Sequence, residues 1–219
     1  MHDLYILDLI GTATFAYYGA YVGLRRQFDI FGIFVVAFLT AVGGGTLREI
    51  LLNNTPFYFF YTWYIVMIAL GILVAYLTFQ SSVRVHIWAL LIDAVGLTTF
   101  AYIGAHAAHM AELGFVGIVF FAVISAIGGG VIRDALISEV PQVFFQDFYA
   151  SPAILLGCVY FFVRSFIDDY VQLPYLIIGG AILLRYLAVL YRWRLWVPWQ
   201  AKPQQHLTVD TVSETIVHD

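Results

Sequence analysis

Long apolar stretches separated by short polar turns dominate the pattern of this chain. Seven stretches approach or reach the roughly 20 residues that a helix needs to cross a bilayer. They are residues 4–24, 31–52, 62–80, 86–108, 115–137, 151–167 and 175–193. The connections are brief and rich in turn-forming residues, as at 53–56 and 168–174. The pattern therefore predicts an all-α integral membrane protein with seven transmembrane helices.

A second pattern appears when the chain is aligned with itself at an offset of 85 residues. Polar residues, glycines and prolines then coincide in a common order without a gap. The matching pairs include Asp8 and Asp93, Gly11 and Gly96, Gly43–Gly45 and Gly128–Gly130, Arg48 and Arg133, and Pro56 and Pro141. Each copy holds three spans, so the second copy enters the membrane with opposite polarity. The chain is thus an inverted repeat of three plus three helices, followed by a seventh.

The duplication also sets the expected organisation of the chain. Residues 1–85 form the first three-helix repeat, and residues 86–170 form the second, inverted one. Residues 171–199 contain the seventh helix. The polar segment 200–219 is expected to be a disordered cytoplasmic tail. Most Lys and Arg residues of the loops fall on one side if the N-terminus lies outside, so we expect an N-out, C-in orientation in the cell (inner) membrane.

Composition changes this picture mainly by exclusion. The 219 residues are 62% hydrophobic and 11% charged, whereas soluble domains are roughly 45–50% apolar and about 25% charged. A Walker-type phosphate loop, a nucleophile triad and a basic patch are all absent from the sequence, so neither an enzyme nor a nucleic-acid partner is expected. His106 and His109 have no clear third ligand, so no metal site is expected either. No cofactor is predicted apart from permeant K⁺ or Na⁺ and bound membrane lipid.

The glycine runs are the strongest candidate for a functional site. Gly43, Gly44 and Gly45 lie just past the middle of the second span, and Gly128, Gly129 and Gly130 occupy the symmetrical place in the fifth. Three glycines bend or open a helix, and freed carbonyls beside water are suitable cation ligands. Alternatively, small residues allow helices to pack closely. The repetition of the run, each time with an arginine and an acid after it, favours a pore or transport site.

Charged residues inside the spans are the next candidates. Arg48 and Glu49 follow the first glycine run, and Arg133 and Asp134 follow the second. Depth in the membrane predicts two symmetry-related charge pairs, Asp8 with Arg48 and Asp93 with Arg133. These pairs either gate a pathway or act as structural clamps. Five hydroxyl residues are candidates for lining a wet path: Thr12, Thr14, Thr98, Thr99 and Ser125.

These motifs carry a resemblance to a known family. The segment from Asp8 to Arg26, the GGGTLRE and GGGVIRD motifs and the proline after each resemble the prokaryotic trimeric intracellular cation (TRIC) channels, a family that overlaps a duplicated bacterial glycine-transporter domain. The resemblance covers about residues 4–193. It implies a homotrimer with a pore in each subunit, formed by glycine-kinked helices 2 and 5 and permeable to K⁺ and Na⁺. It also implies that Arg48 and Arg133 contribute to the pore and its gating.

One part of the family pattern is different here. Animal members carry a Lys-Glu-Val sequence that binds phosphoinositide, and this chain has Arg48-Glu49-Ile50 at the comparable place. The leading hypothesis is a monovalent cation (K⁺) channel gated or limited by its arginine and acid residues. The alternative is a secondary transporter for a small amino acid such as glycine, in which the same helices hold a zwitterion. A membrane scaffold is a third class.

Overall fold

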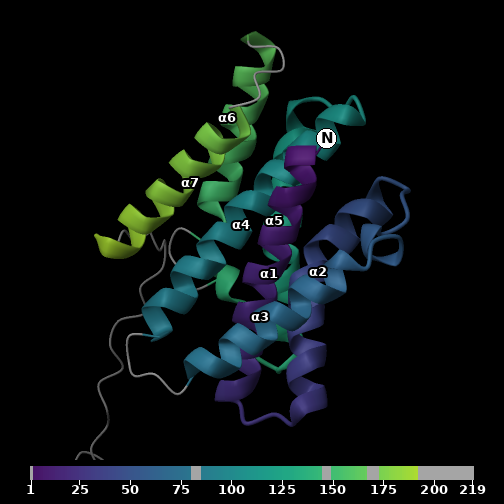
Figure 1. Ribbon diagram of the computed structural model, residues 1–219. Helices are drawn as coiled ribbons and strands as arrows, with labels where there is room; N and C mark the ends of the chain where they lie inside the picture. Colours follow the sequence, from purple (N-terminus) through teal and green to yellow (C-terminus); the bar gives the residue numbers. More distant parts are fainter. Residues whose placement is uncertain (1, 80–84, 145–148, 167–172, 192–219) are drawn as a thin grey trace, which may run out of the picture.

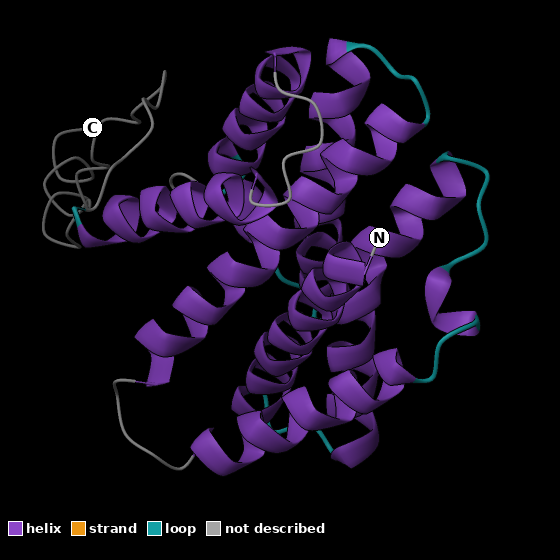
Figure 2. Ribbon diagram, turned by 45° about the horizontal axis from the view of Figure 1, so that its top comes forward, coloured by secondary structure: helices purple, strands orange, loops and turns teal. Residues whose placement is uncertain are grey.

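The computed structural model describes residues 2–79, 85–144, 149–166 and 173–191. These residues form seven α-helices and two short 3₁₀ helices, and Figure 2 shows no strand among them. The α-helices are α1 His2–Arg25, α2 Ile30–Leu51, α3 Trp63–Phe79, α4 Val85–Met110, α5 Phe115–Leu136, α6 Ser151–Phe166 and α7 Leu173–Leu190. The 3₁₀ helices are η1 Phe57–Phe59 and η2 Gln142–Phe144. The predicted all-α fold with seven helices is confirmed.

Four helices form the centre of the molecule. Helix α1 packs against α2 and α4, and α5 packs against the same two helices, so the four close into a ring. The equivalent residues Phe15 and Phe100 meet between α1 and α4, with ring centroids 5.1 Å apart. Helix α3 packs mainly against α1, α6 packs against α5 and α4, and α7 lies beside α4 and α6 (Figure 1). The polar candidates therefore lie on the helices of the central ring.

The outer surface of this bundle is apolar. Large hydrophobic side chains are exposed on several helices, for example Ile30 at 87%, Val116 at 78% and Leu176 at 71%. Such a surface would be unstable in water and is matched to a hydrocarbon environment. Within the described ranges, three helical segments are long and apolar enough to cross a membrane by length and composition, and shorter apolar helices accompany them.

The duplication is visible in the backbone as well as in the sequence. Four non-glycine residues in the described part of the chain have left-handed backbone angles, and they form two pairs at the offset of 85: Gln27 with Glu112, and Asn53 with Ser138. Each follows the end of a helix. In each case the next residue donates a backbone hydrogen bond to the carbonyl five positions back, as Asn54 does to Glu49 at 2.8 Å. These are Schellman caps, so both copies end their first two helices with the same device.

The predicted spans agree with the helices to within a few residues. The boundaries assigned to the repeats and the orientation in the membrane stay predictions. The expected disordered tail, residues 200–219, lies outside the described residues, as does the C-terminal part of segment 171–199. One aspect of sidedness is supported: Arg26, after α1, forms an ion pair with Glu139, after α5. The two connections therefore lie on the same side of the bundle, as the inverted repeat requires.

Candidate functional site

The two glycine runs lie where α2 crosses α5. A Cβ atom added at Gly43 would lie 3.2 Å from the Cα of Gly129, and one added at Gly128 would lie 3.1 Å from the Cα of Gly44. Added at Gly44 or Gly129, it would collide with a backbone carbonyl of the opposite helix, that of Ser125 or Thr40. The runs therefore bring two helix backbones into direct contact, which larger side chains would prevent.

This contact corrects one expectation from the sequence. Both α2 and α5 are continuous α-helices through their glycines, and no glycine among the described residues has a positive φ. The glycines do not open either helix in this structure, so the expected carbonyls freed for a cation are not found there. The physical reason is that a glycine run satisfies two demands equally well, an opened helix and a close crossing. A bend without a break at these positions stays a prediction.

The third glycine of each run makes room for a charged cluster. A Cβ atom at Gly45 would lie 2.7 Å from the ring of Phe57 and 3.9 Å from Nη2 of Arg48. At the equivalent Gly130 it would lie 2.9 Å from the hydroxyl of Tyr149 and 3.7 Å from Nη2 of Arg133. Each run therefore ends in a space that holds an arginine and an aromatic ring.

The first of these spaces holds the first-repeat cluster, which we define as Asp8, Arg48, Glu49, Phe57 and Tyr64. Arg48 is 3% exposed. Its Nε donates to Oε1 of Glu49 at 2.8 Å, and its guanidinium carbon lies 5.6 Å from the ring centre of Phe57. The hydroxyl of Tyr64 donates to Oδ2 of Asp8 at 2.8 Å. Helices α1, α2 and α3 thus each place a polar side chain in this cluster.

The second space holds the second-repeat cluster, which contains Tyr18, Asp93, Arg133, Asp134, Gln142, Tyr149 and Arg185. Arg133 is completely buried. Its Nε donates to Oδ1 of Asp134 at 2.8 Å, and its guanidinium carbon lies 4.8 Å from the ring centre of Tyr18. The other oxygen of Asp134 accepts a hydrogen bond from the backbone N–H of Gln142 at 2.8 Å.

Helix α7 adds a second arginine to this cluster. The guanidinium carbon of Arg185 lies 5.3 Å from the ring centre of Tyr149. Asp93 is buried within electrostatic reach of both Arg133 and Arg185. Helix α7, which lies outside the duplication, therefore adds a positive charge to the second-repeat cluster and not to the first.

The predicted charge pairs are wrong as direct contacts. Each arginine is paired with the acid that follows it, Arg48 with Glu49 and Arg133 with Asp134. Asp8 is instead hydrogen-bonded to Tyr64, although it lies within electrostatic reach of Arg48. The prediction from depth in the membrane was right that Asp8 lies near Arg48. It did not include the acid next to each arginine in the sequence, with which the guanidinium group pairs. The close partner is the one on its own helix.

Some of the hydroxyl candidates have a hydrogen bond or a packing role, and two are buried hydroxyls without a hydrogen-bonding partner among the described residues. Thr14 donates to the carbonyl of Gly11 at 2.8 Å, and Thr98 donates to that of Ala94 at 2.9 Å. Thr99 lies at the contact of α4 with α1, beside Gly11. Ser125 points towards Gly104 on α4, in the same way that its equivalent Thr40 points towards Gly19 on α1.

Thr12 and Ser125 differ from the other three. Both are completely buried, and neither hydroxyl has a hydrogen-bonding partner in the described part of the chain.

Sequence reasoning missed several members of the clusters. Tyr64 and Tyr149 are equivalent at the offset of 85, and both lie beside the acid on the first helix of their repeat. That coincidence was present in the sequence and is the signal that would have found them. Tyr18 and Gln142 have no polar counterpart in the other copy, and only the fold brings them together, with Gln142 Nε2 donating to the Tyr18 hydroxyl at 3.1 Å.

A polar pocket of about 390 Å³ leads towards the second-repeat cluster. Tyr18 and Gln142 line it together with residues of the last two turns of α1 and of the loops after α1 and α5. The full lining is Tyr18, Tyr21, Val22, Arg25, Arg26, Glu139 and Gln142. Because Tyr18 and Gln142 also contact Arg133 and Asp134, the pocket reaches the buried cluster from one side of the bundle.

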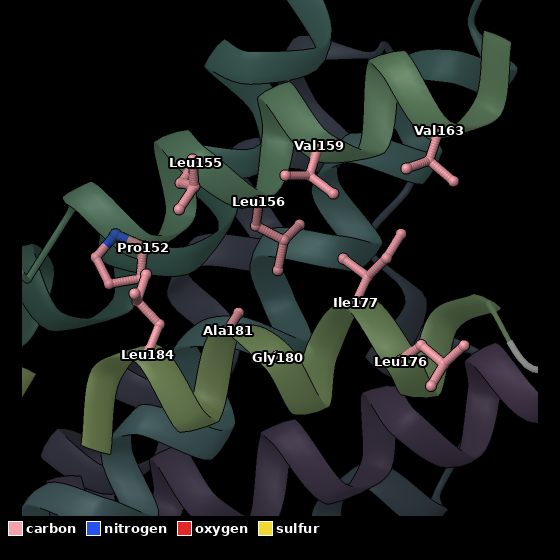
Figure 3. Close-up of a pocket in the computed structure, with 10 residues that line it drawn as sticks. All are labelled: Pro152, Leu155, Leu156, Val159, Val163, Leu176, Ile177, Gly180, Ala181 and Leu184. Atoms are coloured by element: carbon pink, nitrogen blue, oxygen red, sulfur yellow. The ribbon is translucent and has the colours of Figure 1, made fainter. Parts of the chain in front are cut away.

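A different, apolar groove of about 470 Å³ lies between α6 and α7 (Figure 3). Its lining consists of Pro152, Leu155, Leu156, Val159, Val163, Leu176, Ile177, Gly180, Ala181 and Leu184. The groove offers no polar side chain to an ion or a zwitterion, so it is not part of the candidate site.

The metal prediction concerned His106 and His109. The Nδ1 atom of His106 lies 3.0 Å from the Tyr160 hydroxyl, within hydrogen-bonding distance. No group of three or more His, Cys, Asp or Glu residues with the geometry for a metal ion occurs in the ranges that the structure describes.

The fold and the site together define a class: a polytopic, duplicated α-helical membrane protein with a buried arginine–acid cluster on each side of a central glycine crossing. The family model described as "Glycine transporter" matches the chain twice, at residues 5–80 and 90–165. A UPF0126 membrane protein of Deinococcus radiodurans is 38% identical over 201 residues, which cover 89% of each chain. The UPF0126 inner membrane protein YadS of Escherichia coli K12 is 38% identical over 160 residues, covering 72% of this chain and 77% of YadS.

Solved structures give a consistent answer. A prokaryotic TRIC channel crystallised in 0.5 M KCl has a TM-score of 0.80 and 31% identity, covering 89% of this chain and 100% of the other. The TRIC orthologue from Rhodobacter sphaeroides has a TM-score of 0.80 and 26% identity, covering 88% and 100%. The chain therefore belongs to the duplicated glycine-transporter (UPF0126) family, and its resemblance to the prokaryotic TRIC channels is confirmed.

Proposed function

We propose that this protein is a channel for monovalent cations, with the pathway inside each subunit between its two repeats. The observation that carries the proposal is the pair of buried arginine–acid clusters, one on each side of the α2–α5 crossing. Buried charges inside a membrane protein are costly and are typical of ion or substrate pathways. The relatives of known structure are described as TRIC cation channels, which supports the same function for this chain.

The unsatisfied polar atoms add to this argument. Nη1 of Arg48 and Nη1 of Arg133 are buried and lack a hydrogen-bonding partner among the described residues. Buried polar groups are normally paired, either with protein or with ordered water. We infer that water reaches both guanidinium groups, one from each side of the glycine crossing. Conduction then requires α2 and α5 to move apart at Gly44 and Gly129, and the arginines limit or gate the flow.

The finer parts of the proposal come from the resemblance. The channel would assemble as a homotrimer and conduct K⁺, with bound lipid between or around the subunits. It would lie in the inner membrane with its N-terminus outside and its C-terminus in the cytoplasm. The relatives are described as channels or membrane proteins rather than enzymes, and we propose no catalysis.

Recording from the purified protein in planar lipid bilayers tests the proposal. A KCl gradient should give discrete, ohmic current steps whose reversal potential lies towards the K⁺ equilibrium potential. Gly129→Ala, at the crossing, should change the open probability, whereas Gly179→Ala should behave as the unchanged protein because its Cβ meets nothing within 4 Å. Absence of steps from protein whose trimer is intact by size-exclusion chromatography would refute the channel.

The alternative is a carrier for a small amino acid such as glycine, which the description of the matching family model favours. An arginine would bind the carboxylate of the zwitterion, and an acid would bind its ammonium group. Uptake of radiolabelled glycine into proteoliposomes distinguishes the two functions. Saturable uptake without current steps would support the carrier, and steps without uptake would support the channel.

A further inference from the structure

Two buried oxygens of α1 lack a hydrogen-bonding partner within the described ranges. They are Oδ1 of Asp8 and Oγ1 of Thr12. Asp8 is 7% exposed and Thr12 is 0% exposed. The other carboxylate oxygen of Asp8 is occupied, because it accepts the hydrogen bond of Tyr64. Leaving a buried oxygen unpaired is unfavourable, so these two oxygens indicate a bound ion or water.

Both oxygens belong to the face of α1 that is turned towards α2. Residues four and eleven apart recur on the same face of a helix, so Asp8, Thr12 and Gly19 form one stripe. At one end of the stripe Gly19 contacts Ala37 and Thr40 of α2. At the other end Asp8 lies within electrostatic reach of Arg48. Thr12 therefore lies between these points, opposite the glycine run of α2.

The second repeat also has buried oxygens without a partner among the described residues, on Ser125, Gln142 and Tyr149, but all three belong to neutral side chains. It lacks the pair of a carboxylate and a hydroxyl on its first helix. The residue equivalent to Thr12 is Leu97, which is completely buried in the apolar core. The residue equivalent to Asp8 is Asp93, and two arginines rather than one lie within its electrostatic reach. The second arginine, Arg185, comes from α7. The two copies thus differ both in hydroxyl ligand and in charge.

The charge difference is simple to state. In their ordinary charge states, Arg48 carries one positive charge, whereas Asp8 and Glu49 carry two negative charges, which leaves a net charge of −1. In the second-repeat cluster, Arg133 and Arg185 balance Asp93 and Asp134, which leaves a net charge of zero. A cation is attracted to the first arrangement and not to the second.

We propose that a monovalent cation lies between the carboxylate of Asp8, in the first-repeat cluster, and the hydroxyl of Thr12, and that the second-repeat cluster holds none. Carboxylate and hydroxyl oxygens are suitable ligands for K⁺ or Na⁺, and the neighbouring arginine keeps the attraction weak enough for release. This inference rests on the proposed channel function and makes its pathway one-sided. The cation site lies on the predicted outer side of the glycine crossing.

Crystals of the protein grown in a Tl⁺ salt test the site, because Tl⁺ replaces K⁺ and is located by its anomalous scattering. We expect one anomalous peak per subunit beside Asp8 and Thr12, and none beside Asp93 and Leu97. A rise in melting temperature with Tl⁺ concentration then measures affinity in solution. Asp8→Asn should raise the half-saturating Tl⁺ concentration by about tenfold or more, since it removes the net negative charge. Thr12→Leu, which copies the second repeat, should raise it by roughly fivefold.

Two matched variants serve as controls. Asp29→Asn and Thr78→Leu make the same chemical changes at residues whose side chains have partners elsewhere, Gly32 for Asp29 and Val74 for Thr78. They should leave the half-saturating concentration unchanged. If Thr12→Leu does not fold, Thr12→Val removes the hydroxyl with almost no change in volume.

The outcomes separate the site from the channel. Water alone at Asp8 and Thr12, or an equal Tl⁺ peak at Asp93, would overturn the proposed site even if the protein conducts K⁺ in bilayers. A Tl⁺ peak at Asp8 in a protein that shows no current steps would keep the site and overturn the channel. A peak that survives in both Asp8→Asn and Thr12→Val would also overturn the proposal, because other groups would then hold the ion.

Discussion

The glycine crossing makes a graded prediction for alanine substitutions. At Gly44 and Gly129 the new Cβ atom meets a backbone carbonyl oxygen of the opposite helix. Carbon–oxygen contacts between helices are about 3.3–3.6 Å, so α2 and α5 would have to move apart by roughly 1 Å. At Gly43 and Gly128 the nearest atoms are the tips of Ile132 and Leu47, at 2.8 and 3.0 Å, and these side chains can turn aside. At Gly179, on α7, nothing lies within 4 Å.

The magnitudes follow from two opposing effects. Forcing an extra methyl group into a packed contact costs about 1–3 kcal/mol, and the collision with backbone belongs at the upper end. Replacing glycine by alanine inside a helix stabilises the helix by about 1 kcal/mol. We therefore expect Gly44→Ala and Gly129→Ala to lose about 2 kcal/mol, and Gly179→Ala to gain up to about 1 kcal/mol.

Thermal unfolding in detergent, followed by fluorescence-detected size exclusion, measures the series. For a chain of this length, each kcal/mol moves the melting temperature by about 2–4 °C. Gly44→Ala and Gly129→Ala should thus melt roughly 4–8 °C lower, Gly43→Ala and Gly128→Ala should fall between, and Gly179→Ala should melt no lower than the unchanged protein. Equal melting temperatures for all five variants would refute the close crossing of α2 and α5.

Three further predictions concern single residues and use the same unfolding measurement. Arg133→Gln should lower the free energy of unfolding by about 3–5 kcal/mol, because it leaves Asp134 buried without its partner. The double variant Arg133→Gln, Asp134→Asn should recover part of this loss. A double variant as unstable as the single one would count against the pair. Tyr64→Phe removes a hydrogen bond to a carboxylate and should lose about 1.5–3 kcal/mol of stability. The control Tyr61→Phe, at an exposed ring, should leave the stability unchanged. Equal effects of the two variants would exclude the hydrogen bond to Asp8. Glu112→Gly should gain about 1 kcal/mol of stability, because Glu112 has a left-handed backbone that glycine adopts without strain. The control Ala107→Gly, inside α4, should lose about 1 kcal/mol. A loss at both positions would contradict the Schellman cap.

Hydropathy was sufficient to predict the helices, because a bilayer demands long apolar segments and the turns between them are short. Depth in the membrane also placed Asp8 near Arg48, and the offset of 85 gives Asp93 and Arg133 the same relation. Neither hydropathy nor the repeat predicts how a helix is rotated about its axis or which conformation a long side chain adopts. The direct partners of Arg48 and Arg133 therefore came only from the structure.

The glycine runs show a different limit of sequence reasoning. A helix that opens and two helices that cross closely both require residues without side chains, so composition predicts either. The structure shows a close crossing, because Gly44 and Gly129 each face a backbone carbonyl of the opposite helix. The neighbours of Gly45 and Gly130, namely Phe57 and Tyr149, come from segments that no local pattern links to the runs.

The two copies of the repeat have the same helix caps, the same glycine crossing and the same arginine–acid pairs. A pathway built only from these shared features would be the same from either side of the membrane. The differences at and beside the clusters include Thr12 against Leu97, Tyr18 and Gln142 without polar counterparts, and Arg185 from a helix that the duplication does not contain. Since the shared features are the same from both sides, any preference of the protein for one direction of flow, or for a cation on one side, has to arise from differences of this kind.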